Sequence, residues 1–227
     1  MKNYYLMDLE KIREQVKSKE RVYNHGEVYT NEREVNAMLD LVKQETERID
    51  SRFLEPACGT GNFLVEVLQR KLAVVESRYR KNQLDYERYA IIAISSIYGV
   101  DLLQDNVEEC RERLLKIFAE HYHSNFRSTC KEECLASAKF ILSKNIIHGD
   151  ALTLKTVDNG DEPIVFAEWS AVNGSMIKRR DFKFSYLLST HSSNEMNLFS
   201  DEDSAAYIPK PFREYPLTHF LNLAEHA

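Results

Sequence analysis

The sequence predicts an α/β fold in which parallel strands alternate with crossover helices. Three short strand-like segments, at 51–55, 97–101 and 145–148, are separated by longer stretches whose apolar residues recur at helical spacing. Each strand-like segment ends at or just before an acidic residue. Such alternation implies a parallel sheet, and ligands bind these sheets at the carboxyl ends of the strands.

Composition and charge limit the functions to consider. The 227 residues are 43% apolar and 29% charged, which is typical of a globular protein with one well-buried core. A net charge of −6 does not favour a protein that grips a phosphate backbone alone. The basic cluster Lys178, Arg179, Arg180 and Lys183 is interpreted first as a strand with exposed cations, and second as a phosphate contact.

The sequence also bears on the compartment. No apolar run approaches the roughly 20 residues that a membrane helix needs, and the first residues lack the apolar core of a signal peptide. Four cysteines are too few for a disulfide scaffold in a chain of this length. We therefore expect a cytoplasmic protein without a membrane partner.

Helices are expected on both sides of the first strand. Residues 8–20 have helical apolar spacing, and a turn is expected at 23–26. Thr30 or Asn31 is suited to cap the next helix, because a short polar side chain accepts from the amides of the first turn. The later expected elements are a helix at 86–95, a strand at 97–101, a helix capped by Asp105, and a helix that follows the capping box Thr129-Cys130-Lys131-Glu132 and ends near Ser143.

Beyond Leu154 the pattern changes to β-structure. Residues 163–169 and 175–182 are expected to pair, because Asn173-Gly174 between them is a strong hairpin signal. The polar stretch 188–206 is expected to be an exposed loop. We divide the chain into an N-terminal helical segment at 1–50, a core at 51–154 and a C-terminal β-hairpin extension at 155–227.

The most informative segment is Phe53-Leu-Glu-Pro-Ala-Cys-Gly-Thr-Gly-Asn-Phe-Leu64. A strand ends on Glu55, and Gly59 and Gly61 allow the backbone to approach a ligand closely. A helix then begins at Asn62 and offers free N–H groups at its positive end. The string resembles motif I of S-adenosylmethionine-dependent methyltransferases, in the form typical of N6-adenine DNA methylases of restriction-modification systems.

Three further segments resemble the same family in the same order. His25-Gly-Glu-Val-Tyr-Thr30 is similar to its N-terminal cofactor segment, although Asn31 stands where the family has a proline. Ile97-Tyr-Gly-Val-Asp101 resembles motif II, and Ile147-His-Gly-Asp-Ala-Leu152 resembles motif III. The resemblance covers about 20–154 and implies a Rossmann-like methyltransferase sandwich.

The resemblance implies a site for S-adenosylmethionine. It assigns Glu55 and the glycine loop to the methionine moiety, Asp101 to the ribose hydroxyls and Asp150 to the adenine amino group. A carboxylate suits the ribose because both of its oxygens are acceptors. The cofactor-binding residues implied are Tyr29, Thr30, Glu55, Pro56, Ala57, Gly59, Thr60, Gly61, Asn62, Phe63, Asp101, Leu102, Asp150 and Ala151.

One element of the family is missing from the sequence. Methylation of an exocyclic amine uses an (Asp/Asn/Ser)-Pro-Pro-(Tyr/Phe) loop, whose polar groups accept from the amine and whose ring stacks on the flipped base. The sequence has no Pro-Pro pair, and Ala167-Glu-Trp-Ser170 is a remote substitute at best. The fold is therefore expected to be incomplete, with no catalytic residue assigned. The segment 213–220 resembles the tail of an insert that precedes this loop in some relatives.

The sequence is compatible with three functions. The first is adenine-N6 transfer to DNA, weak or absent in the isolated chain, with DNA contacted through a partner or the full enzyme. The second is a non-catalytic cofactor-binding scaffold, or a split subunit that pairs with a chain supplying the catalytic motif. The third is methyl transfer to a small molecule or a protein.

Other reactive side chains carry weaker hypotheses. His121, His123, Cys130 and Cys134 lack the usual spacing of zinc ligands, so we expect no metal site. Cys58 lies in the glycine loop, but a nucleophile would need a base beside it, so a packed small residue is the preferred interpretation.

Overall fold

The computed structural model describes residues 18–25, 27–28, 30–157, 161–188 and 210–226. Its helices are α2 (Lys19–His25), α3 (Glu32–Asp40), α4 (Lys43–Thr46), α5 (Asn62–Tyr79), α6 (Gln83–Ser95), α7 (Gln104–Phe126) and α8 (Glu132–Asn145), with 3₁₀ turns η1 (Arg127–Thr129) and η2 (Leu223–His226). Its strands are β1 (Phe53–Glu55), β2 (Ile97–Asp101), β3 (Ile146–Asp150), β4 (Lys155–Thr156), β5 (Val165–Ala171), β6 (Met176–Lys183), β7 (Arg213–Glu214) and β8 (Thr218–His219).

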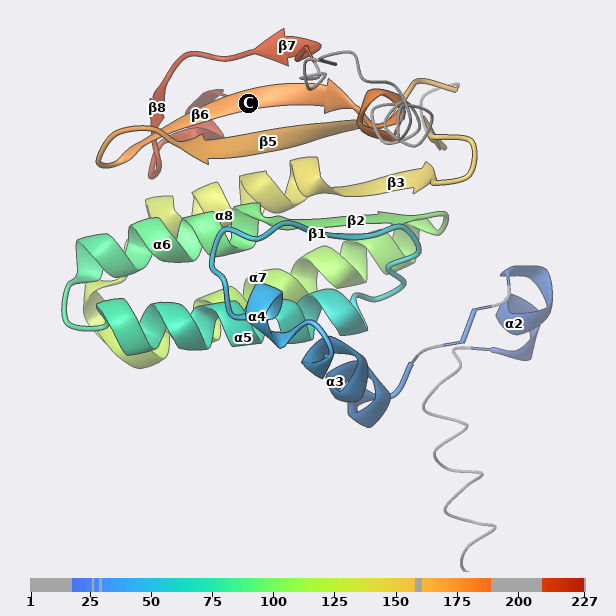
Figure 1. Cartoon of the computed structure of the whole chain (residues 1–227), viewed down its shortest axis with the longest axis horizontal. Helices are drawn as coiled ribbons and strands as arrows, with labels where there is room; N and C mark the ends of the chain where they lie inside the picture. The colour runs from blue at the N-terminus through green and yellow to red at the C-terminus, as the bar shows by residue number, and fades with distance from the viewer. Residues whose placement is uncertain (1–17, 26, 29, 158–160, 189–209, 227) are drawn as a thin grey trace, which may run out of the picture.

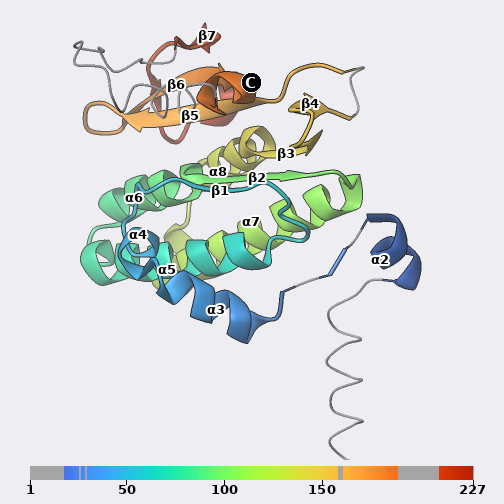
Figure 2. The same ribbon diagram turned by 45° about the vertical axis from the view of Figure 1, so that its right-hand side comes forward.

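A parallel sheet lies at the centre of the molecule. β1 pairs with β2 and β2 with β3 in parallel, and the short β4 pairs antiparallel with β3. The long helices α5, α6, α7 and α8 lie between these strands in the chain. Figures 1 and 2 show α5 and α7 on one side of the sheet and the β5–β6 hairpin on the other. The predicted mixed α/β fold with parallel strands is thus confirmed.

Burial follows the apolar pattern of the sequence. In β2, residues 97–100 are all buried, as expected for a parallel strand that is covered on both faces. In α5 the buried apolar residues are Leu64, Val67, Leu68, Leu72 and Val75, which recur at the helical spacing that predicted this helix. Each such burial stabilises the fold by roughly 1.5–3 kcal/mol relative to exposure.

Lys71 is fully buried among these apolar residues of α5. Its ammonium donates to the carbonyl of Ile49 at 3.2 Å, to the carbonyl of Ser51, and to Ser96 Oγ at 2.6 Å. Its Nζ also lies 5.2 Å from the centre of the Phe53 ring. Burial lowers the pKa of Lys71 to about 7. These contacts fasten the chain that enters β1 to α5 and to the start of β2.

The C-terminal extension forms the predicted hairpin. β5 and β6 pair antiparallel from Val165 opposite Lys183 to Ala171 opposite Ile177, and Gly174 in the turn has a φ of 52°. The first strand begins two residues later than the sequence predicted. The segment 213–220 takes part in the same sheet, since β7 and β8 within it both pair with β6, and its resemblance to an insert tail stays a prediction.

The extension packs on the core, a point that the sequence left open. Phe220 is fully buried, and Leu223 is nearly so, in the same apolar cluster as the helices. Asn145 is fully buried at the junction of α8 and β3. Its Nδ2 donates to the carbonyls of Ser95 and Ile97 at 3.1 Å each, and its Oδ1 accepts from Trp169 Nε1 at 3.0 Å. One buried amide thus ties β5 to the amino-terminal ends of β2 and β3.

Two predicted helix caps are wrong. Asp105 lies in the first turn of α7, whose N-cap is Leu103, and its carboxylate pairs with Arg21 instead. Thr129 does not cap α8, because its hydroxyl is hydrogen bonded to Gln83 and to the carbonyl of Phe126. In both cases the side chain that the local pattern predicted to cap a helix instead contacts a residue that is distant in sequence.

Other boundaries differ by a few residues. The turn expected at 23–26 is wrong for residues 23–25, because these residues form the end of α2. α6 begins at Gln83 rather than at Tyr86, since Asn82 accepts from two amides of its first turn. α8 continues to Asn145, so β3 occupies 146–150 rather than 145–148.

Some predictions lie outside the described residues. These are residues 8–17 of the helix expected at 8–20, and residues 189–206 of the polar loop expected at 188–206. Within the described part of the chain, none of the helices is both long enough and apolar enough to cross a bilayer. The domain limits at 50 and 154 stay predictions.

Candidate functional site

A cavity of about 640 Å³ lies at the carboxyl ends of β1, β2 and β3. Three loops that are far apart in sequence converge on it, as the parallel arrangement predicted. The residues of the predicted cofactor site that line this cavity are Thr30, Glu55, Pro56, Ala57, Gly59, Asn62, Phe63, Asp101, Leu102, Asp150 and Ala151. Tyr29 lies outside the described residues, and Thr60 and Gly61 do not line the cavity.

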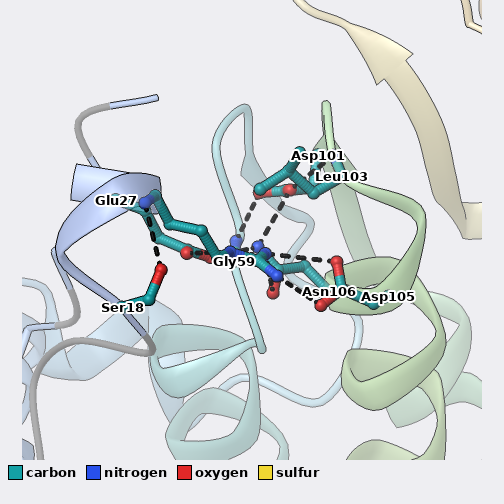
Figure 3. A network of polar contacts seen from close by, with 8 residues as sticks. Ser18, Glu27, Gly59, Asp101, Leu103, Asp105 and Asn106 are labelled. Carbon is teal, nitrogen blue, oxygen red and sulfur yellow. Dashed lines mark hydrogen bonds and ion pairs between the residues drawn. The ribbon is translucent and has the colours of Figure 1, made fainter. Parts of the chain in front are cut away.

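The carboxylate of Asp101, at the end of β2, accepts three hydrogen bonds within the cavity wall. Its Oδ2 accepts from the Gly59 amide at 2.8 Å, and its Oδ1 accepts from the Leu103 amide at 2.9 Å and from Asn106 Nδ2 at 3.2 Å. Figure 3 shows this carboxylate facing all three donors. A carboxylate offers about four acceptor positions, so one remains on Oδ2 in this arrangement. To accept hydrogen bonds from two ribose hydroxyls, Asp101 would have to lose one of its three present hydrogen bonds.

The two glycines of the loop have different surroundings. Gly59 has a φ of 51° and lines the cavity, so its lack of a side chain leaves room there. Gly61 has a φ of 87°, and a Cβ at this position would lie 2.6 Å from Cys110 Sγ on α7. The lack of a side chain at Gly61 therefore allows the loop to pack closely against α7, and its predicted contact with a ligand stays a prediction.

Thr60 also turns toward α7. Its carbonyl accepts from the Arg113 guanidinium at 2.7 Å and its hydroxyl at 3.0 Å. The same guanidinium donates to Asn62 Oδ1 at 2.8 Å, and Asn62 Nδ2 donates to the carbonyl of Thr30 at 2.9 Å. Arg113 and Asn62 thus join the glycine loop, the start of α5 and the N-terminal segment into one wall of the cavity.

The substitution of the family's proline by Asn31 has a local structural explanation. Asn31 is the N-cap of α3, and its Oδ1 accepts from the Glu34 amide at 2.9 Å. Proline has no side chain that can accept in this way. The neighbouring Thr30 still lines the cavity, so the substitution leaves that predicted residue in place.

Two carboxyl groups of the cavity have opposite pKa shifts. Burial raises the pKa of Glu55 at the end of β1, and a hydrogen bond from the Ala57 amide offsets part of this effect. The Leu152 amide lowers the pKa of Asp150, since its hydrogen bond at 2.8 Å stabilises the ionised form. Both side chains line the cavity and both are partly buried, so the two shifts differ in their cause: burial for Glu55 and an amide donor for Asp150.

Sequence reasoning missed Asn106 as a residue of the site. Asn106 is almost fully buried on α7 and lines the cavity. Its Nδ2 donates both to Asp101 and to Glu27 Oε1, the latter at 2.6 Å. The available signal was a polar residue directly before the apolar stripe that begins at Val107.

The remaining candidates have structural roles or lie outside the cavity. Ala167-Glu-Trp-Ser170 does not line the cavity, and Glu168 pairs with Arg52 and Arg180, so this segment does not replace the missing acceptor loop. Cys58 belongs to the glycine loop and borders the cavity, but its side chain is buried, as its packed interpretation predicted. Among the described residues, no group of three or more His, Cys, Asp and Glu side chains is arranged to hold a metal ion.

The basic cluster of β6 is largely occupied by carboxylates. Three of its four cations form ion pairs at 2.8–3.0 Å: Lys178 with Glu214, Arg179 with Asp181, and Arg180 with Glu168. The ammonium of Lys183 lies 4.9 Å from the centre of the Phe212 ring. The arrangement favours a structural role for the cluster over a phosphate contact.

Comparison with protein families agrees with the geometry of the cavity. A family model described as the DNA-methyltransferase domain of MmeI matches residues 28–160, which is more than half of the chain. No curated protein and no solved structure matches. The matched range contains all three loops of the cavity and is a restriction-modification methyltransferase-like region, of a kind that generally uses S-adenosylmethionine. The chain therefore belongs to the family of the MmeI DNA-methyltransferase domain.

Proposed function

We propose that this chain is the cofactor-binding part of an adenine-N6 DNA methyltransferase of a restriction-modification system. The observation that carries the proposal is the convergence of a glycine loop and three strand ends on one cavity, in a chain of this family. The strands β1, β2 and β3 are then one part of a Rossmann-like methyltransferase sandwich.

The residues of the cavity fit S-adenosylmethionine. A volume of about 640 Å³ lies within the range of roughly 300–1,000 Å³ that small-molecule sites have. Asp101 retains an acceptor position for a ribose hydroxyl, and Asp150 suits the adenine amino group because its carboxylate is readily ionised. Glu55 and Gly59 are the proposed neighbours of the methionine end. When bound, the cofactor supplies an electrophilic methyl group on its sulfur.

We further propose that a second chain supplies the acceptor loop and most of the contact with DNA. The sequence has no Pro-Pro pair, and the candidate substitute lies outside the cavity. Among the described residues, β1 pairs with β2 alone, so its other edge carries no strand. A groove of about 390 Å³ between β1 and the β5–β6 hairpin has Leu54, Phe166 and Phe182 among its lining residues, which offers apolar surface to a partner. The isolated chain would then have weak activity or none.

A cytoplasmic setting belongs to the same proposal. All four cysteines of the chain are free thiols in the structure, and three of them are buried. Free thiols persist in a reducing compartment, which is where a protein acting on the DNA of a cell would be found.

The absence of the acceptor loop also favours a second candidate function. The chain would be a non-catalytic scaffold that keeps a cofactor cavity and serves a catalytic partner. The two candidates differ in what a reconstituted complex does to DNA. Labelled methyl transfer to adenine that depends on the cofactor cavity of this chain supports the first, whereas activity that persists when Asp101 is replaced by Ala supports the scaffold.

The first experiment is isothermal titration calorimetry of the whole chain with S-adenosylmethionine and with its demethylated product. We expect micromolar binding that Asp101→Ala abolishes. Asp50→Ala is the matched control, because Asp50 is an exposed carboxylate that does not line the cavity. Absence of binding by the folded protein would refute a working cofactor site. Unchanged affinity in Asp101→Ala would refute the ribose assignment alone.

A further inference from the structure

The N-terminal helix α2 is connected to the cavity by one arginine. The Arg21 guanidinium donates to both carboxylate oxygens of Glu27 and to both of Asp105. It also reaches Asn106 Oδ1 at 3.2 Å, while its own amide donates to Ser18 Oγ at 3.1 Å. Figure 3 shows Ser18 and Glu27 on the N-terminal side of this network and Asp105 and Asn106 on α7.

This network continues to the predicted ribose carboxylate. The Glu27 carboxylate accepts from Asn106 Nδ2, and the same nitrogen donates to Asp101 Oδ1. Asp101 in turn accepts from the Gly59 amide of the glycine loop. Five residues from four segments thus form one unbroken chain of hydrogen bonds, with Arg21 at one end and the loop at the other.

Charge explains why Arg21 is needed at that end. Glu27 is only 8% exposed, and it lines the cavity together with Asp101. Asp105 adds a third carboxylate nearby. A buried carboxylate without a cation is strongly unfavourable, and removal of one partner of such a pair leaves the other uncompensated. Without Arg21, the Glu27 carboxylate loses two charge-assisted hydrogen bonds, which favours a shift of this carboxylate away from Asp101 and toward water. Such a shift would alter the bond between Glu27 and Asn106, and through it the position of Asp101.

We infer that Arg21 is a positioning residue of the cofactor site, which fixes Asp101 through Glu27 and Asn106 and couples the docking of α2 to occupation of the cavity. This inference rests on the proposed function for its ligand, S-adenosylmethionine. By linkage, the cofactor then strengthens the docking of α2 by the same factor by which a docked α2 strengthens cofactor binding.

The test compares Arg21→Gln with Arg33→Gln, which removes the same charge from an exposed position on α3. Calorimetry with S-adenosylmethionine is expected to show an affinity that is at least about fivefold weaker in Arg21→Gln and unchanged in Arg33→Gln. Arg21→Lys should fall between, because lysine keeps the charge but cannot contact two carboxylates in a fork. In a protease assay, the cofactor should slow cleavage within 18–28 in the wild type and not in Arg21→Gln.

A second measurement needs no ligand. The Gly59 and Leu103 amides both donate to Asp101, so their NMR resonances report the position of that carboxylate. Arg21→Gln is expected to shift both resonances, and Arg33→Gln to leave them in place. A merely structural role of Arg21 in holding α2 would not reach these two amides.

The outcomes separate this inference from the proposed function. If the wild type binds the cofactor and Arg21→Gln binds it equally well, the inference is overturned and the proposed function stands. If the wild type does not bind, the proposed cofactor site fails, and the two amide resonances alone decide. Shifted resonances then support the positioning role, and unshifted resonances overturn it.

Discussion

Gly61→Ala is predicted to destabilise the protein through contact with α7 rather than through the cofactor. Gly61 has a φ of 87°, where an alanine is disfavoured by about 1–2 kcal/mol. Its new Cβ would lie 2.6 Å from Cys110 Sγ, and overpacking of this kind costs about 1–3 kcal/mol. We therefore expect a loss of about 2–5 kcal/mol in the free energy of unfolding, measured by urea titration of the protein without ligand.

Gly174→Ala is the matched control for the backbone contribution. Gly174 has a φ of 52°, and nothing lies within 4 Å of the Cβ that it would gain. Its replacement should therefore cost only the conformational part, about 1–2 kcal/mol. The difference between the two variants measures the contact with α7.

A double-mutant cycle with Cys110→Ala tests the same point directly. Without the sulfur, the alanine at position 61 has room, so the second substitution should cost about 1–3 kcal/mol less than it does in the wild type. If Gly61→Ala and Gly174→Ala cost the same, or if Cys110→Ala does not change the cost, the reasoning from packing is refuted. The motif glycine would then owe its presence to the ligand.

Three further predictions concern stability. Because the pKa of Lys71 is lowered to about 7, the folded protein binds fewer protons above that pH than the unfolded chain does. The free energy of unfolding of the wild type, compared with that of Lys71→Met, should therefore rise by about 2 kcal/mol from pH 7 to pH 9. Trp169→Phe leaves the buried Asn145 Oδ1 without its donor and should cost about 1–3 kcal/mol in urea unfolding. Asn31→Ala removes the cap that accepts from Glu34 and should cost about 1 kcal/mol by the same measurement.

The predictions for Lys71 and for Asn31 each have an outcome that would contradict them. A pH dependence that is the same with and without Lys71 would mean that the amine has an ordinary pKa in the fold. Asn31→Ser should retain most of the stability, because serine also caps helices well. A loss in Asn31→Ser equal to that in Asn31→Ala would show that capping is not the reason.

The central sheet could be predicted because its signals are local. The strand at 97–101 was predicted with both ends correct, since four buried apolar or small residues lead directly into Asp101. The convergence of the loops followed from parallel topology alone, without any knowledge of side-chain contacts. Eleven of the predicted site residues consequently line one cavity.

Contacts between distant segments could not be predicted in this way. Asp105 and Thr129 have the residue types and spacing of helix caps, and nothing nearby in sequence shows that Arg21 and Gln83 engage them. The role of Asn106 depends on Glu27, which lies 79 residues earlier in the chain. The burial of Phe220 depends on how the extension folds back onto the helices, which local pattern does not determine.

The position of Asn145 has a consequence for the roles of the two ends of the sheet. Its three hydrogen bonds attach the hairpin at the amino-terminal ends of β2 and β3, whereas the cavity opens at their carboxyl ends. The two ends of the sheet therefore have different roles: the amino-terminal end holds the hairpin, and the carboxyl end is open to a ligand. A substitution of Asn145 is therefore expected to lower the stability of the fold without altering the residues that line the cavity.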